Sequence, residues 1–221
     1  MVGFTDTGMR AVGLPSGIAR AAAAGGSEVQ LVGRVGEDPG GDFVLLDLTA
    51  ALVGHVAILR DPGRPTPAAP PPPDDEAVFD EATDMPAAAD GNSRVDGETG
   101  PGVSGLSLEP ADIELALRYL PDYRVLVVAD QLDDASLRVV TAAAGWNGAA
   151  LIVVAAAGDA RPPIGDDATI IEAPLDDPDG AFAAVVGAYA AALDRGEEPA
   201  EAFTTASTSV GWAAVATDSA V

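Results

Sequence analysis

Residues 177–183, DPDGAFA, form an acidic turn with a glycine that leads into an alanine-rich run of helical character. The N-terminus of a helix is able to bind anions, because its first backbone N–H groups lack partners and the helix dipole is positive there. Gly180 and Ala181 occupy the turn itself. The pattern predicts a phosphate-binding turn, but Asp179 just before it would repel an incoming phosphate.

Several other kinds of catalytic site are excluded by the residue types that the chain lacks. It contains no cysteine, a single histidine (His55), and 11 basic residues that are all arginines. Thiolate nucleophiles, cysteine zinc sites and a P-loop lysine are therefore excluded, and we expect no metal site. In the apolar context GHVAIL, His55 is predicted to end a strand rather than to act as a catalyst.

The composition predicts a folded, strongly acidic protein. Apolar residues make up 48% of the 221 residues, and the formal net charge is −24. Such a charge repels nucleic-acid backbones and anionic membranes, so neither is an expected partner. The N-terminal residues lack the continuous apolar core of a signal peptide, which favours a cytoplasmic location.

Hydrophobic periodicity predicts alternating strands and helices. Strands are predicted at EVQLVG (28–33), HVAIL (55–59), RVLVVA (124–129), AALIVVAAA (149–157) and ATIIEA (168–173). Helices are predicted at 16–24, 40–54, 109–120, 133–145, 180–194 and 199–215. Ser16 is expected to cap the first of these helices, and Gly54 to stop the second.

Continuous apolar strands that alternate with helices indicate an α/β fold with a mostly parallel sheet covered on both faces. Residues 1–60 and 105–221 are predicted to be two parts of one such domain. Residues 61–104 interrupt it with a proline-rich acidic segment, which includes PTPAAPPPPDDE and buries too little apolar area to order itself.

The stretch from Val12 to Gly41 carries two glycine motifs at a fixed separation. It resembles the early signature of the PfkB, or ribokinase-like, family of carbohydrate kinases, which reads roughly G-G-x-x-x-N-x-A and later G-R-x-G-x-D-x-x-G. The positions that match are Gly13, Ala19, Gly26, Gly36, Asp38 and Gly41. Val12 replaces the first glycine, and Gly17 replaces an asparagine that helps to hold the sugar in the family. Thr66 also stands where the family has the threonine of a Pro-Thr-Gly motif.

The acidic turn resembles the second signature of the same family, D-T-x-G-A-G-D, at Asp177, Gly180 and Ala181. Phe182 stands in place of its second glycine. Ala183 stands in place of the aspartate that is the family's catalytic base. No catalytic residue is therefore expected, unless Asp179 substitutes as the base.

The resemblance implies a ribokinase-like three-layer α/β/α fold whose lid is reduced or disordered, with residues 61–104 in its place. It assigns Gly13, Gly17, Gly36 and Asp38 to a remnant of the substrate region, and Gly180 and Ala181 to a remnant of the phosphate turn. The chain is also shorter than the family between the strand at 149–157 and Asp177.

Three functions remain open. The first is a pseudokinase that has lost phosphoryl transfer and binds a sugar, nucleoside or nucleotide, or regulates another protein. The second is an active ATP-dependent carbohydrate or nucleoside kinase with a rearranged site, which would need ATP and Mg²⁺. The third is a structural or partner-interaction module. The sequence is compatible with a monomer or a homodimer.

Overall fold

The computed structural model describes residues 2–5, 8–11, 13–67, 108–120, 122–158, 160–165, 167–175, 177 and 179–211, the first two segments by their backbone alone. The proline-rich segment predicted at 61–104 lies outside the described residues from residue 68 onward. Its first residues continue β4 and the turn after it as far as residue 67.

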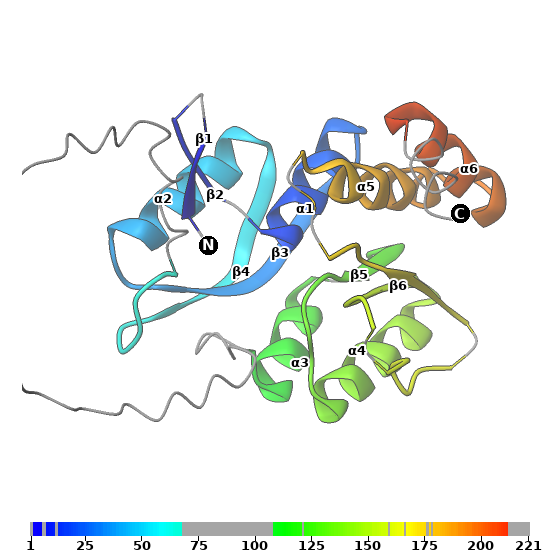
Figure 1. Cartoon of the computed structure of the whole chain (residues 1–221). Helices are drawn as coiled ribbons and strands as arrows, with labels where there is room; N and C mark the ends of the chain where they lie inside the picture. Colours follow the sequence, from blue (N-terminus) through cyan, green and yellow to red (C-terminus); the bar gives the residue numbers. More distant parts are fainter. Residues whose placement is uncertain are drawn as a thin grey trace, which may run out of the picture.

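Helices and strands alternate along most of the chain (Figure 1). The N-terminal part contains β1 (Val2–Thr5), β2 (Gly8–Ala11), α1 (Leu14–Ala24), β3 (Val29–Gly36), α2 (Pro39–Ala50) and β4 (Val53–Asp61). The C-terminal part contains α3 (Pro110–Tyr119), β5 (Val125–Val128), α4 (Asp134–Asn147), β6 (Ala150–Ala155), β7 (Ala168–Glu172), α5 (Ala181–Asp194) and α6 (Pro199–Val210). Within the described segments, no helix is long and apolar enough to cross a bilayer.

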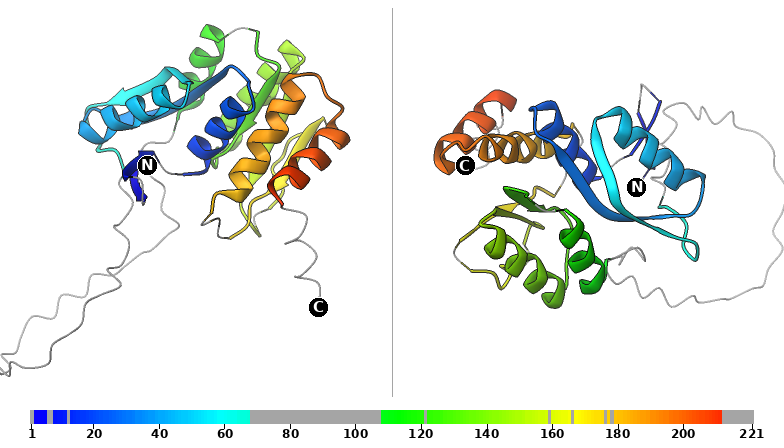
Figure 2. Two further views of the ribbon diagram at one scale, coloured as in Figure 1. Left: turned by 90° about the horizontal axis from the view of Figure 1, so that it is seen from above. Right: turned by 180° about the vertical axis from the view of Figure 1, so that it is seen from behind.

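The strands after the β1–β2 hairpin pair in parallel, as predicted. β3 pairs with β4, and β5, β6 and β7 form a three-stranded sheet with β6 in the centre. Instead of one continuous sheet, the described strands form two parallel sheets. β5 is the edge of the larger sheet that faces β3 (Figures 1 and 2).

Helices cover both faces of the three-stranded sheet, which gives the predicted three layers. Ile152 and Val154 of β6 pack toward α5, whereas Leu151 and Val153 pack toward α3 and α4. Because successive side chains of a strand point to opposite faces, the continuous apolar run of β6 serves both cores. In the smaller sheet, Val53 packs with α2 in a separate core.

Three predicted helix ends are wrong, and α6 is one of them, because it ends at Val210 with Gly211 as its C-cap and not at residue 215. The N-cap of α1 is Gly13, at φ 118°, and Ser16 lies inside the helix, where its hydroxyl donates to the Gly13 carbonyl. Such a positive φ disfavours any residue with a Cβ atom, so the backbone at Gly13 and not the serine side chain begins this helix. The second helix, α2, ends at Ala50, and Gly54 lies within β4. Leu52, at φ 59°, makes the reversal that glycine was expected to make.

Small residues let α1 and α5 pack against each other at very short range (Figure 2). A Cβ atom on Gly17 would lie 2.9 Å from the Ala183 Cβ atom, and one on Gly25 would lie 2.9 Å from that of Ala191. Between them, a Cβ atom on Gly187 would lie 2.6 Å from the carbonyl oxygen of Ile18. Residues four apart share one face of a helix, so these contacts form a single line along the helix pair.

We predict that Gly187→Ala destabilises the protein by about 1–3 kcal/mol, because the added methyl group forces the two helix backbones apart. Gly145→Ala is the matched control. Gly145 lies within α4 with open space around it, so alanine there should add about 0.5–1 kcal/mol of stability. Urea unfolding measures both values, and a Gly187→Ala variant as stable as the parent would contradict the helix contact.

Candidate functional site

The predicted phosphate-binding turn leads into α5, but a carboxylate of the chain itself occupies its amide groups. Gly180 is the N-cap of α5, at φ 68°. The two carboxylate oxygens of Asp177 accept hydrogen bonds from Phe182 N–H (3.0 Å) and Ala183 N–H (3.2 Å). The groups that would hold an anion at a helix N-terminus are therefore bonded to an internal anion.

Ala183, which stands where the PfkB signature has an aspartate, is buried against α1. Ala183 is 6% exposed and faces Gly17, across the short contact between α1 and α5. Gly17 and Ala183, each one of the two departures in its PfkB signature, are thus direct neighbours. Their small size closes the space that two polar side chains would need.

Phe182 does not crowd the turn, although it replaces a glycine. Its side chain is 2% exposed and lies in the core with Ile152 and Val186. Its backbone N–H remains at the turn and donates to Asp177. The substitution therefore adds apolar burial to α5, of roughly 1.5–3 kcal/mol for a fully buried phenylalanine.

Asp38, Gly36 and Thr66 form a second, separate cluster at the carboxyl end of β3. The Asp38 carboxylate accepts from Gly41 N–H (2.7 Å), Thr66 N–H (2.7 Å) and the Thr66 hydroxyl (2.8 Å). The Thr66 hydroxyl in turn accepts from Gly36 N–H (2.9 Å). We call these residues the Asp38 clasp: it caps α2 and fastens the segment after β4 to the end of β3.

The clasp is both tight and charged. A Cβ atom on Gly36 would lie 2.6 Å from Thr66 N, so glycine is needed for the two segments to approach. The backbone N–H groups of Gly41 and Thr66, together with the Thr66 hydroxyl, hold the pKa of Asp38 below its ordinary value. All of the contacts found for the Asp38 carboxylate are internal, so they explain the residue without a substrate.

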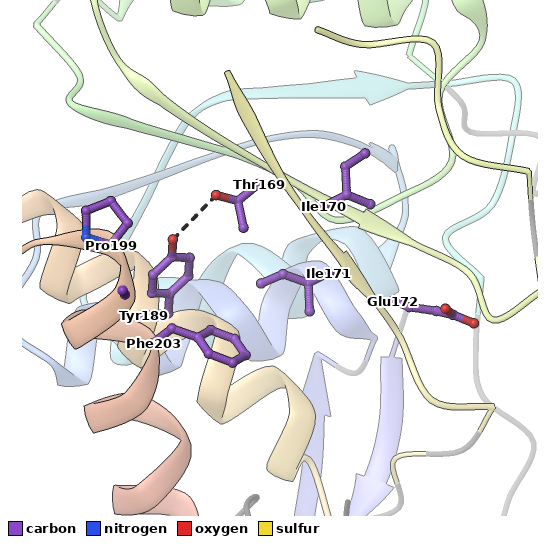
Figure 3. A pocket seen from close by; sticks show the side chains of 8 residues that line it. Thr169, Ile170, Ile171, Glu172, Tyr189, Pro199 and Phe203 are labelled. Carbon is purple, nitrogen blue, oxygen red and sulfur yellow. Dashed lines mark hydrogen bonds between the residues drawn. The ribbon is translucent and has the colours of Figure 1, made fainter. Parts of the chain in front are cut away.

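Two surface cavities in the described part of the chain involve other residues. One, of about 450 Å³, lies between β7 and the helices α5 and α6 (Figure 3). The other, of about 550 Å³, lies between α3 and α4 and includes Trp146. None of the predicted site residues lines either cavity. In the part of the chain that is described, no cluster of three or more histidine, aspartate or glutamate side chains is arranged for a metal ion.

Solved structures share this arrangement of elements over most of the chain. The structure named Sa239 matches with a TM-score of 0.61 at 13% sequence identity, and covers 89% of this chain and 80% of its own. A "putative Ribokinase II" from E. coli matches with a TM-score of 0.56 at 13% identity, over 90% of this chain and 80% of its own. The chain therefore has a ribokinase-like fold.

At these identities the comparison establishes the fold alone. A fructokinase from Xylella fastidiosa with bound ATP also matches, with a TM-score of 0.40 at 18% identity. By sequence, the chain matches no protein-family model and no curated protein.

Within the ribokinase-like fold, the predicted site residues fall into two groups. Gly13, Gly17, Gly180 and Ala181 lie at or near one end of the contact between α1 and α5, where Ala183 meets Gly17. Gly36 and Asp38 belong to the clasp, whose described contacts are with α2 and the segment after β4. Asp179 lies exposed on the turn. The sequence reasoning placed Asp177 in the motif, but did not predict that its carboxylate would bind the helix amides.

The spacing of small residues was a signal that could have revealed the helix contact. Gly17, Ala21 and Gly25 are four residues apart, and so are Ala183, Gly187 and Ala191. This pattern is typical of helices that approach closely, because small residues at one face let the backbones come together.

We predict that Thr66→Val destabilises the protein by about 1–3 kcal/mol, because the Gly36 N–H and the Asp38 carboxylate lose a buried partner. Thr49→Val is the matched control. The Thr49 hydroxyl bonds only to the Leu45 carbonyl on the exposed side of α2, so its loss should change the free energy of unfolding by less than about 0.5 kcal/mol. Equal effects of the two substitutions in chemical denaturation would contradict the clasp.

The clasp also predicts how stability depends on pH. The pKa of Asp38 is lower in the folded protein than its ordinary value, so its contribution is present above about pH 3.9 and is lost as the pH falls further. Asp38→Asn should lower the melting temperature most at neutral pH, and the difference from the parent should shrink toward pH 3. A difference that is the same at both pH values would contradict this assignment.

Proposed function

We propose that this chain is a ribokinase-fold protein that does not transfer phosphoryl groups and acts instead as a ligand-binding or regulatory protein. The observation that carries the proposal is the contact of Ala183 with Gly17. Where the PfkB signature has the base and a sugar-holding asparagine, this chain has two small residues packed against each other. The contact therefore supports the pseudokinase hypothesis that the sequence raised.

Loss of the base removes the proton acceptor for a sugar hydroxyl. General bases contribute about 10²- to 10⁴-fold to rate, and alanine has no group that titrates. Asp179, the alternative base, is exposed on the turn, whereas Ala183 is buried between the helices. The exposed Asp179 carboxylate therefore does not lie at the buried position where the signature has the catalytic base.

The helix N-terminus does not fit the phosphate groups of ATP. The N–H groups of Phe182 and Ala183 are bonded to the Asp177 carboxylate, and Asp179 adds a second negative charge on the same turn. A phosphate would have to displace an internal carboxylate and approach a like charge. The proposed ligand class remains the one that the sequence resemblance implies: a sugar, nucleoside or nucleotide.

Kinase activity is tested by a phosphoryl-transfer assay with Mg²⁺ and ATP against a panel of sugars and nucleosides. We expect no turnover above the rate without protein. A thermal-shift screen with the same compounds tests for binding, because a ligand that binds only the folded state raises the melting temperature. A magnesium-dependent phosphoryl-transfer activity that co-purifies with the folded protein would overturn the proposal. The absence of any shift would remove the ligand-binding part and leave a partner-interaction role.

The role of Asp177 is tested by freeing the amides that it binds. Asp177→Ala should destabilise the protein by about 1 kcal/mol through loss of a helix cap. It should also make the melting temperature rise with sulfate or inorganic phosphate more steeply than in the parent. Asp179→Ala is the matched control, since it removes the same charge from the same turn but leaves the amides bonded. Identical responses of the two variants to anions would contradict the internal capping.

An aspartate at position 183 should destabilise the fold and not restore kinase activity. Ala183→Asp places a charge in the apolar core cluster between α1 and α5 and should cost about 3 kcal/mol or more. Ala184→Asp is the control, because the next residue lies on a less buried side of the same first turn, where a negative charge is favourable. If Ala183→Asp is as stable as Ala184→Asp, the space at this contact is larger than the packing implies.

A further inference from the structure

β7 is the last strand of the three-stranded sheet, and its outer edge has no strand beside it among the described residues. Its ladder with β6 is continuous from Ala168 to Glu172, without a bulge. Edge strands expose a row of backbone donors and acceptors, which act as a template for another strand. The opposite edge, β5, faces the smaller sheet, so β7 is the edge that is turned outward (Figure 2).

The backbone N–H and C=O groups of β7 alternate in direction, and this alternation identifies the groups that point outward. Ala173 N–H donates to the Ala155 carbonyl of β6 over 2.8 Å. Because N–H and C=O groups of alternate residues point to opposite sides of a strand, Ile171 and Thr169 also face β6. The N–H and C=O groups of Ile170 therefore point away from the sheet.

β7 lacks the usual features that prevent edge-to-edge pairing. Its sequence, ATIIE, contains no lysine, no proline and one charge, at its end. That charge, Glu172, accepts a hydrogen bond from Gly158 N–H over 3.1 Å, which draws the side chain toward the preceding loop. The central part of the edge is therefore uncharged in a protein whose net charge is −24.

An apolar groove lies directly beside this edge (Figure 3). Thr169 and Ile171 point toward Tyr189 and Phe203, whereas Ile170 points to the other face of the strand. The rings of Tyr189 and Phe203 pack edge to face with their centroids 5.5 Å apart, and Phe203 is 38% exposed. The groove and the open edge form one surface that a neighbouring strand would cover.

We propose that this surface is a self-association site, in which β7 pairs antiparallel with β7 of a second copy about a twofold axis at Ile170. In this register Thr169 of one copy stands opposite Ile171 of the other, and Ala168 stands opposite Glu172. Opposite residues of an antiparallel pair have their side chains on the same face, so Ile171 of each copy covers the groove of the other. The two Glu172 side chains lie at opposite ends of the pair.

A second copy is the occupant that the chemistry of this edge favours. The surface is self-complementary, as a twofold interface requires, because the same donors, acceptors and apolar groove meet on both sides. The uncharged middle of β7 is where two chains of charge −24 repel each other least. Salt screens the remaining repulsion. The dimer should therefore become tighter when the ionic strength rises about tenfold, from about 0.05 M to about 0.5 M.

Sedimentation equilibrium of the full chain tests the proposal with two substitutions at the centre of the interface. Ile170→Pro removes the outward N–H and leaves the N–H groups that bond to β6, so it should weaken the dimer by about 10-fold or more. Ile170→Ala removes a similar part of the side chain but retains the N–H, so it should weaken the dimer much less. Circular dichroism and the melting temperature verify that each variant is folded.

A cross-linking measurement fixes the register and does not depend on the proline variant. The chain has no cysteine, so Ile170→Cys introduces a single thiol. Facing residues at the centre of a hydrogen-bonded pair have Cα atoms about 5.5 Å apart, within the range for a disulfide. Under mild oxidation Ile170→Cys should form a covalent dimer faster than Ile171→Cys, whose counterpart is Thr169.

Dimers that Ile170→Pro weakens and Ile170→Cys traps support the proposal. A parent that is monomeric at every protein and salt concentration would overturn it. So would a dimer that Ile170→Pro leaves unchanged, or one that Ile171→Cys traps as fast as Ile170→Cys. None of these results depends on kinase activity, so they are distinct from the test of the proposed function.

Discussion

The close approach of α1 and α5 is the constraint on which the rest of this structure depends. It holds an early helix against a late one and joins the part of the fold before the proline-rich segment to the part after it. Other contacts join the same two parts. The Arg34 guanidinium lies 2.5 Å from the Asp112 carboxylate, and the Arg195 guanidinium donates to the Gly25 carbonyl over 3.2 Å. The helix contact differs from these because it tolerates almost no added volume. The same restriction requires small residues at positions 17 and 183.

The motifs that remain in the chain have structural explanations of their own. Asp38, Gly36 and Thr66 match family signatures, and the clasp that they form caps α2 and orders the segment after β4. Asp177 and Gly180 match the second signature, and they begin α5. A residue that caps a helix or permits a tight approach is required by the fold whether or not chemistry takes place. Matches of this kind are therefore stronger support for the ribokinase-like fold than for its activity.

Much of the fold was predictable, because the apolar runs are long and well separated. The strand β6 and the helix α5 could be identified from hydrophobic continuity and small apolar residues alone. Two helix ends were less predictable. Ser16 and Gly54 have the right residue types for a cap and a stop, but the positive φ values of Gly13 and Leu52 placed those features elsewhere. A local preference of about 1 kcal/mol is easily outweighed by the packing of the neighbouring elements.

The sequence by itself determined the α/β class, the parallel pairing, the resemblance to ribokinase-like proteins and the alanine at position 183, where the PfkB signature has an aspartate. Each of these depends on residue types and local spacing, which can be read directly along the chain. Only the tertiary structure decided that Ala183 meets Gly17, that the Asp177 carboxylate occupies the amides of α5, and that β7 has an open edge beside a groove. These features join residues that are distant in sequence or depend on backbone direction. A short contact between two helices and an unpaired strand edge exist only once the chain has folded.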